Sequence, residues 1–184
     1  TAAEDEEDTS KISLNLDLYT AFCEGFVGET AGIITPAEIM YYEDGSWTNI
    51  SHAQLNDATG TTILDLMNVA QDPNDKDHYF VTSYGAGLLE MQGADFVKRY
   101  TPSNSSLTSA DAKAPDAYTR TDGAMIDEQG YLWVLNTSVV HNVHIKDVRG
   151  NSLAAYDLFY NGVRIPLYTP GEILVDRRNT HWKW

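Results

Sequence analysis

The chain has 184 residues, 42% of them hydrophobic and 21% charged, which is enough for one domain with a full core and typical of a soluble globular protein. Its 27 acidic and 12 basic residues give a formal net charge of −15, which repels phosphate backbones and anionic membrane surfaces, so nucleic-acid binding is not expected. No apolar run approaches the roughly 20 residues that a membrane-spanning helix needs, so no membrane span is expected in this chain.

The first half of the chain begins with an acidic run at residues 1–10, which predicts a solvated, disordered tail. Apolar and polar residues then alternate strictly from Lys11 to Leu18, the period of a half-buried strand. Glycines and a proline interrupt residues 19–37, which predicts a strand with an irregular connection. A hairpin is expected from Glu38 to Ser51, because its Asp44-Gly45 dipeptide favours a tight turn between two strands.

Two four-strand units are predicted next, each made of two successive hairpins. The first has strands at Ile63–Val69, Tyr79–Tyr84, Gly87–Met91 and Phe96–Thr101. The second has strands at Thr121–Ile126, Tyr131–Asn136, Asn142–Val148 and Leu153–Phe159. Between them, residues 102–118 are rich in small polar residues and predict a loop without a helix. A last hairpin, Glu172–Asp176 and His181–Trp184, begins a third unit.

The units repeat one pattern, in which an aliphatic run, an Asp, a polar turn and an aromatic strand follow one another. The aromatic positions Phe80, Trp133 and Trp182 lie 53 residues (80 to 133) and 49 residues (133 to 182) apart. Asp127 and Gly130 stand at the first and fourth positions of a type I turn, so Asp127 is expected to form the turn and Trp133 to lie in the core.

Four-stranded, aromatic-bearing units at this period are typical of β-propeller blades. The sequence therefore predicts an all-β fold, a β-propeller segment of about three four-stranded antiparallel blades in an incomplete ring. The blade-like units are expected at about residues 11–51, 61–101, 120–160 and, truncated, 171–184. An open arc has unpaired strand edges, so we expect the remainder of the propeller or another chain to pair there.

No catalytic motif and no cofactor site is predicted. His141 and His144 lie near Asp147, but a spacing of three on a strand places the two rings on opposite faces, so no metal site is expected there. The acidic loop from Asp72 to Asp77 resembles a calcium loop, but such a loop needs an oxygen ligand at residue 76, which is Lys, and an acid at residue 83, which is Ser, so a turn explains it better. Paired carboxylates remain possible in a chain with 27 acidic residues, so a propeller glycosidase or lyase stays an alternative.

The run Asp127–Val134, Asp-Glu-Gln-Gly-Tyr-Leu-Trp-Val, resembles the two-component regulator propeller repeat, which occurs in extracytoplasmic sensors of Bacteroidetes. Three longer stretches resemble the PorZ-like propeller proteins of the type IX secretion system. They are Glu38–Ile50, His78–Glu90 and Tyr100–Leu107. The resemblance implies an exported, non-catalytic protein of the periplasm or cell surface. The resemblance further implies that the protein acts as a binding or assembly module for a protein or glycan ligand.

The ligand-sensing propeller of a hybrid two-component regulator is the first alternative to this function. In either case a recognition face would lie on the connections between second and third strands and between successive blades, because those connections share one face of a propeller. Tyr84, Arg120 and His141 lie near such connections and are the predicted binding residues.

Overall fold

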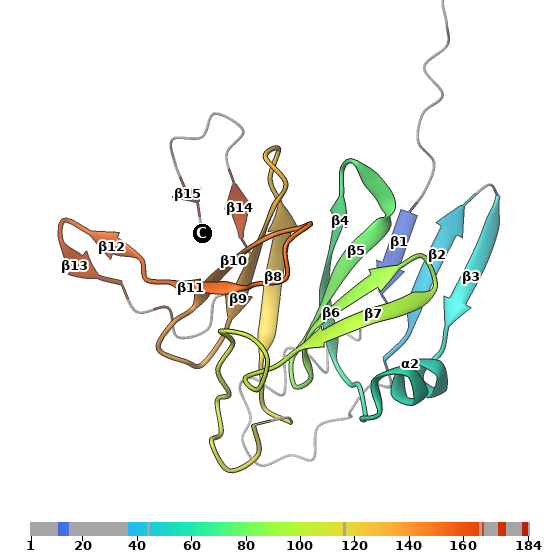
Figure 1. Ribbon diagram of the computed structural model, residues 1–184, viewed down its shortest axis with the longest axis horizontal. Helices are drawn as coiled ribbons and strands as arrows, with labels where there is room; N and C mark the ends of the chain where they lie inside the picture. Colours follow the sequence, from blue (N-terminus) through green and yellow to red (C-terminus); the bar gives the residue numbers. More distant parts are fainter. Residues whose placement is uncertain are drawn as a thin grey trace, which may run out of the picture.

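Antiparallel β-sheets follow one another in chain order and stand side by side (Figure 1). The computed structural model describes residues 11–14, 37–43, 45–115, 117–165, 167, 173–175 and 182–183. The tail predicted at residues 1–10 and nearly all of the irregular connection predicted at residues 19–37 lie outside the described residues. No helix in the described part of the chain is long and apolar enough to cross a membrane.

The first sheet has three strands in the order β1 (Lys11–Leu14), β2 (Ile39–Glu43) and β3 (Ser46–Ile50). β2 and β3 form the predicted hairpin, and Gly45 in its turn has a φ of +78°, a value that glycine adopts without steric cost. The strand predicted from Lys11 to Leu18 is described only as far as Leu14, where it pairs with β2.

The next two sheets each have four antiparallel strands, which confirms the predicted four-stranded units. The second sheet contains β4 (Leu66–Asp72), β5 (Asp75–Ser83), β6 (Gly87–Gln92) and β7 (Asp95–Tyr100) in that order. The third contains β8 (Thr121–Ile126), β9 (Tyr131–Asn136), β10 (Val143–Asp147) and β11 (Ala154–Tyr156). In both sheets neighbours in sequence are neighbours in space, so each is a meander. The described sheets form an all-β, partial propeller-like arc that does not close into a ring.

These two sheets are repeats of one another in register. Ser83 at the end of β5 pairs with Leu66, and Asn136 at the end of β9 pairs with Thr121. Ser83 and Asn136 lie 53 residues apart (83 to 136), the same spacing that separates Phe80 from Trp133. The pattern that marked the repeat in the sequence therefore marks equivalent positions in the two sheets.

Two hydrophobic clusters fill the spaces between successive sheets. Tyr79 and Val81 on β5 belong to the cluster shared with the first sheet, whereas Phe80 belongs to the cluster shared with the third sheet, as alternation along a strand requires. Leu132 and Val134 on β9 join the second cluster. Trp133, expected in the blade core, does not belong to this cluster: it extends from the other face of β9, and its side chain is half-buried.

The helix α2 (His52–Thr59) was not predicted from the sequence. Ser51 and Gln54 form a capping box, in which the Gln54 amide donates to Ser51 Oγ (3.4 Å) and the Ser51 amide donates to Gln54 Oε1 (2.9 Å). Gly60, at φ +68°, ends the helix in the left-handed conformation.

The predicted strand Leu153–Phe159 is also corrected, because β11 ends at Tyr156 and the chain turns away. A separate hairpin follows, made of β12 (Phe159–Tyr160) and β13 (Val163–Arg164). Its turn is Asn161-Gly162, both at positive φ (+49° and +77°), which is the Asn-Gly signal of a primed turn. The last predicted hairpin is confirmed, since β14 (Leu174–Val175) pairs with β15 (Trp182–Lys183).

Candidate functional site

A pocket of about 390 Å³ opens where the β5–β6 connection meets the segment that leads into β8. The segment between α2 and β4 completes its wall. The pocket is lined by Thr61, Thr62, Leu64, Asp65, Tyr84, Gly85, Ala86, Ala117, Tyr118 and Arg120. Its volume lies within the range of about 300–1,000 Å³ in which small-molecule sites fall.

Backbone hydrogen bonds between the two segments hold the pocket's shape. The Thr119 amide donates to the Gly85 carbonyl (3.0 Å), and the Gly87 amide donates to the Thr119 carbonyl (2.8 Å). Ala86 and Thr119 thereby form a parallel β-bridge. The β5–β6 connection and the segment before β8 are thus paired as neighbouring strands are. This pairing fixes the positions of the pocket residues on both segments.

A buried hydroxyl strengthens the same junction. Thr121 Oγ1 accepts a hydrogen bond from the Ser83 amide (3.1 Å) and lies within donating distance of the carbonyls of Gly87 (2.7 Å) and Ser83 (3.2 Å). Thr121 is fully buried, so these bonds are shielded from water. The first strand of the third sheet is therefore fastened to the end of β5 in the second.

The two glycines of the β5–β6 connection allow this close approach. A Cβ on Gly87, which has a φ of +83°, would lie 2.3 Å from the Tyr100 carbonyl oxygen, and a Cβ on Gly85 would lie 3.0 Å from that of Ala117. Both neighbours are backbone atoms that cannot move aside as a flexible side chain would. Gly85 and Gly87 therefore allow the tight connection between two strands of one sheet.

Arg120 enters the pocket from the chain just before β8. Its carbonyl accepts from the Thr137 amide (2.9 Å) and from Asn136 Nδ2 (2.8 Å), so the third sheet fixes its backbone. Its guanidinium carbon lies 4.8 Å from the centre of the Tyr84 ring and 5.7 Å from that of Tyr118. These are cation–π distances, at which the face of each ring attracts the positive charge.

The side chain of Arg120 is partly buried, and one of its donors has no polar partner in the part of the chain that the structure describes. Its Nε is buried and has no hydrogen-bond partner among the described residues. An arginine donor that is removed from water without a partner costs free energy, on the order of 1–3 kcal/mol. The pocket thus contains a cation held by aromatic rings, with hydrogen-bonding capacity left over.

Of the three predicted binding residues, the structure brings Tyr84 and Arg120 together in this pocket. His141 does not line it; it lies on the β9–β10 connection, half-exposed, with Nδ1 2.9 Å from Asp157 Oδ1. Tyr118 was missed, although it stands two residues before Arg120 and alternation in an extended segment places both side chains on one side.

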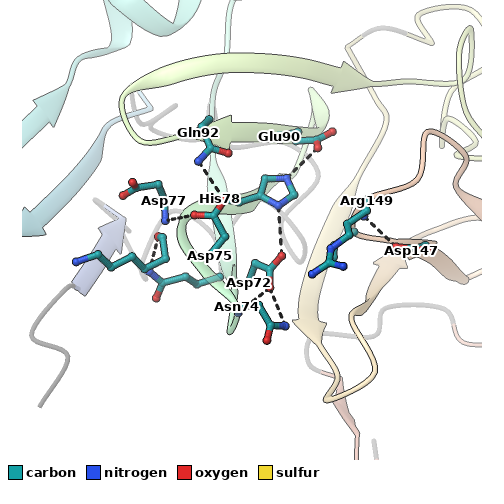
Figure 2. Close-up of polar contacts among 12 residues, drawn as sticks. Asp72, Asn74, Asp75, Asp77, His78, Glu90, Gln92, Asp147 and Arg149 are labelled. Atoms are coloured by element: carbon teal, nitrogen blue, oxygen red, sulfur yellow. Dashed lines mark hydrogen bonds and ion pairs between the residues drawn. The ribbon is translucent and has the colours of Figure 1, made fainter. Parts of the chain in front are cut away.

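A second polar region lies between the same two sheets at the opposite, turn end of their strands (Figure 2). His78 Nε2 is 2.9 Å from Glu90 Oε1, and His78 Nδ1 is 3.5 Å from Asp72 Oδ2. The Tyr100 hydroxyl donates to Glu90 Oε2 (2.6 Å). From the third sheet, Lys146 Nζ lies 4.0 Å from Glu90 Oε1. The polar side chains of this region therefore find their hydrogen-bond and ion-pair partners among one another.

Burial and these contacts shift several pKa values. Burial, with the Glu90 carboxylate as acceptor, raises the pKa of Tyr100 well above its usual range. Burial lowers the pKa of Lys146, whose Nζ donates to the carbonyls of Asp147 (3.0 Å) and Val148 (2.9 Å). Burial also lowers the pKa of His144 to about 4. Tyr100 and His144 are therefore neutral near pH 7, which suits a structural role.

The residues considered as metal ligands are separated or used in turns. His144 is fully buried, with Nδ1 2.8 Å from Ser106 Oγ, whereas His141 pairs with Asp157. Asp72 Oδ1 accepts from the Asn74 amide (2.9 Å), a turn-forming contact. Within the ranges that the structure describes, no three His, Cys, Asp or Glu side chains are grouped so that they could hold a metal ion.

Fold and site together define a class: an all-β chain of propeller-like four-stranded sheets with an arginine–tyrosine pocket between two successive sheets. No family model matches the chain. Among solved structures it is similar to PorZ, described as an essential bacterial surface component of the type IX secretion system of Porphyromonas gingivalis, with 22% identity and a TM-score of 0.66. The match covers 77% of this chain and 18% of PorZ, so the chain spans about a fifth of that protein's length. At this identity the likeness establishes the fold alone.

Proposed function

We propose that this chain is a non-catalytic propeller module of an exported protein, and that it serves type IX secretion at the periplasmic face or the cell surface by binding a partner. The observation that carries the proposal is the likeness of its fold to PorZ over 77% of the chain. The sequence resemblance at Glu38–Ile50, His78–Glu90 and Tyr100–Leu107 supports it independently of the coordinates.

The pocket at Tyr84, Tyr118 and Arg120 is our candidate for the binding site. It lies on connections between strands, where loops held by a rigid scaffold commonly carry function. Its Arg120 has aromatic contacts and an unsatisfied Nε, whereas the buried polar side chains at the turn end are satisfied by one another. The partner would be a protein or a glycan, and the open strand edges would pair with further propeller strands or another chain.

Genetic complementation in the host bacterium tests the proposal. We expect deletion of the gene to abolish the release of type IX cargo proteins, and the unaltered gene to restore it. A double variant, Tyr84→Ala with Arg120→Met, should fail to restore release while reaching the cell envelope at the normal level. Gln129→Ala, an exposed change at the turn end, is the matched control and should restore release fully.

Two outcomes would contradict the proposal. Normal cargo release after deletion would remove the role in secretion. Full restoration by the double variant would retain that role but place the binding site elsewhere. Immunoblots of envelope fractions distinguish either outcome from loss of the protein.

A further inference from the structure

Arg120 is the one cation among the described residues that line the pocket, and its surroundings prepare it for a particular ligand. The rings of Tyr84 and Tyr118 lie against the guanidinium at 4.8 Å and 5.7 Å. The N–H groups of a guanidinium lie in the plane of the group, so its edge is the direction in which it can donate hydrogen bonds. A ligand that uses this edge must present acceptors.

The Arg120 guanidinium also determines how the acceptors of the ligand must be arranged. A guanidinium presents a planar fork of donors that matches two parallel acceptors, as in a carboxylate or a phosphate. The net charge of −15 and the Asp65 side chain in the pocket wall both disfavour a dianion. A singly charged carboxylate loses less to that repulsion than a phosphate does.

The apolar part of the ligand follows from the rest of the wall. Leu64, Ala86 and Ala117 line the pocket together with the two tyrosine rings. Such a surface accepts a flat apolar body next to the charged group, and aromatic bodies pack against tyrosine in offset or edge-to-face geometry. Thr61 and Thr62 add hydroxyls that can bond further polar groups of the ligand.

We propose that this pocket binds an organic carboxylate, with its charged group on the edge of Arg120 and its apolar body against Tyr84 and Tyr118. The inference rests on the proposed binding role of the same site and specifies its ligand chemistry. The carboxylate could belong to a small free acid or to the end of a polypeptide, and the two sources share the chemistry that Arg120 recognises.

Titration of the isotope-labelled chain, followed by amide chemical shifts, tests the proposal. Benzoate should shift the amide signals of Gly85, Ala86 and Ala117 with a dissociation constant on the order of a millimolar, the range expected for a ligand of this size. Benzamide, which has the same shape and no charge, should bind at least about tenfold more weakly, and inorganic phosphate should also bind more weakly. Hippurate, which carries a peptide bond before its carboxylate, should bind more tightly than benzoate if the natural ligand is a chain end, and no more tightly if it is a free acid.

Two variants identify the binding group. Arg120→Met should abolish the benzoate shifts, and Arg120→Lys, which keeps the charge and loses the fork, should weaken binding at least about fivefold. The spectra themselves report whether each variant is folded. Equal binding of benzoate and benzamide, unchanged binding by Arg120→Met, or no shifts at the pocket would overturn the carboxylate proposal. The two proposals can fail separately. If benzoate does not bind but the Tyr84→Ala, Arg120→Met double variant fails to restore cargo release, the site keeps its proposed function and its ligand is of another kind.

Discussion

Arg120 and Lys146 are two cations between the same pair of sheets, at opposite ends of their strands. Lys146 is 1% exposed, donates to two carbonyls at 3.0 Å and 2.9 Å, and has Glu90 at 4.0 Å. Arg120 contacts two aromatic rings, and its buried Nε has no partner in the described part of the chain. The difference separates a fully buried cation from a partly buried one: the paired lysine joins the sheets, whereas the arginine has a donor left for the proposed ligand.

The same difference extends to the residues around the two cations. At the turn end, Asp72, His78 and Glu90 are linked to one another (Figure 2), and Tyr100 donates to Glu90. Removing any member of this network leaves others unsatisfied. At the pocket end, the hydrogen bonds that join the sheets are made by the backbone and by Thr121. The side chains of Tyr84 and Arg120 take no part in these bonds. Changes to the side chains of Tyr84 and Arg120 should therefore affect binding more than stability.

Glycine substitutions give the largest expected contrast between the two ends. Gly87→Ala at the pocket end should lower the free energy of unfolding by about 4 kcal/mol or more, because its Cβ would lie 2.3 Å from the Tyr100 carbonyl oxygen at a φ of +83°. Gly93→Ala at the β6–β7 turn also has a positive φ (+56°) but meets nothing within 4 Å, so about 1 kcal/mol is expected. Urea unfolding followed by circular dichroism measures both. Equal losses would show that the close approach at Gly87 can relax.

Replacing each cation with methionine tests the comparison directly. Lys146→Met should cost about 3 kcal/mol, because the Glu90 carboxylate and two carbonyls lose a buried partner. Arg120→Met should change stability by less than about 1 kcal/mol, since it removes an unpaired buried donor together with two cation–π contacts. Parallel urea titrations decide the matter. A larger loss at Arg120 than at Lys146 would reverse the roles assigned to the two residues.

His144 makes stability depend on pH. Its Nδ1 lies 2.8 Å from Ser106 Oγ and its Nε2 lies 3.1 Å from the His141 carbonyl, a pattern that suits a neutral ring with its proton on Nε2. Burial lowers the pKa from 6.5 to about 4, so the unfolded chain binds the proton more readily than the folded chain. The stability contribution is complete above pH 6.5 and is lost as the pH falls toward 4, by about 2–3 kcal/mol.

Urea unfolding of the unaltered chain and of His144→Gln at pH 7, 5.5 and 4.5 isolates this contribution. The variant will be less stable at pH 7, and the difference between the two proteins should shrink as the pH falls through the window. A difference that stays constant from pH 7 to pH 4.5 would contradict the lowered pKa of His144.

Much of the fold could be predicted because it depends on local patterns. Alternation identified β1, the Asp44-Gly45 dipeptide identified the β2–β3 hairpin, and the spacing of Phe80 and Trp133 identified the repeated sheet. The helix α2 and the β12–β13 hairpin were missed despite local signals, the Ser51–Gln54 capping box and the Asn161-Gly162 turn. The helix lies between two predicted units, at residues that were assigned to neither, and the hairpin begins at Phe159, which was assigned to the last strand of a unit.

The candidate site could be predicted only in part, because it depends on how distant segments meet. Tyr84 and Arg120 follow from the rule that propeller connections of one kind share a face, and their contact requires the Ala86–Thr119 bridge that only the folded chain has. The network of His78, Glu90 and Lys146 joins residues 56 positions apart in the chain (90 to 146), and no spacing in the sequence indicates it.

Asp127 gives the smallest expected effect and tests whether the turn end is held by side chains in both sheets. Its Oδ1 accepts from the amides of Gln129 (3.0 Å) and Tyr131 (2.8 Å), and its Oδ2 accepts from Trp133 Nε1 (2.8 Å). Asp127→Ala should cost about 1–2 kcal/mol, because three donors in a half-buried turn lose their acceptor and water can replace it only in part. Gln129→Ala, whose exposed side chain has no role in the turn, should change stability by less than about 0.5 kcal/mol. If both variants unfold at the urea concentration of the unaltered chain, the backbone alone holds the β8–β9 turn, and side-chain networks at this end are confined to the second sheet and its contact with Lys146.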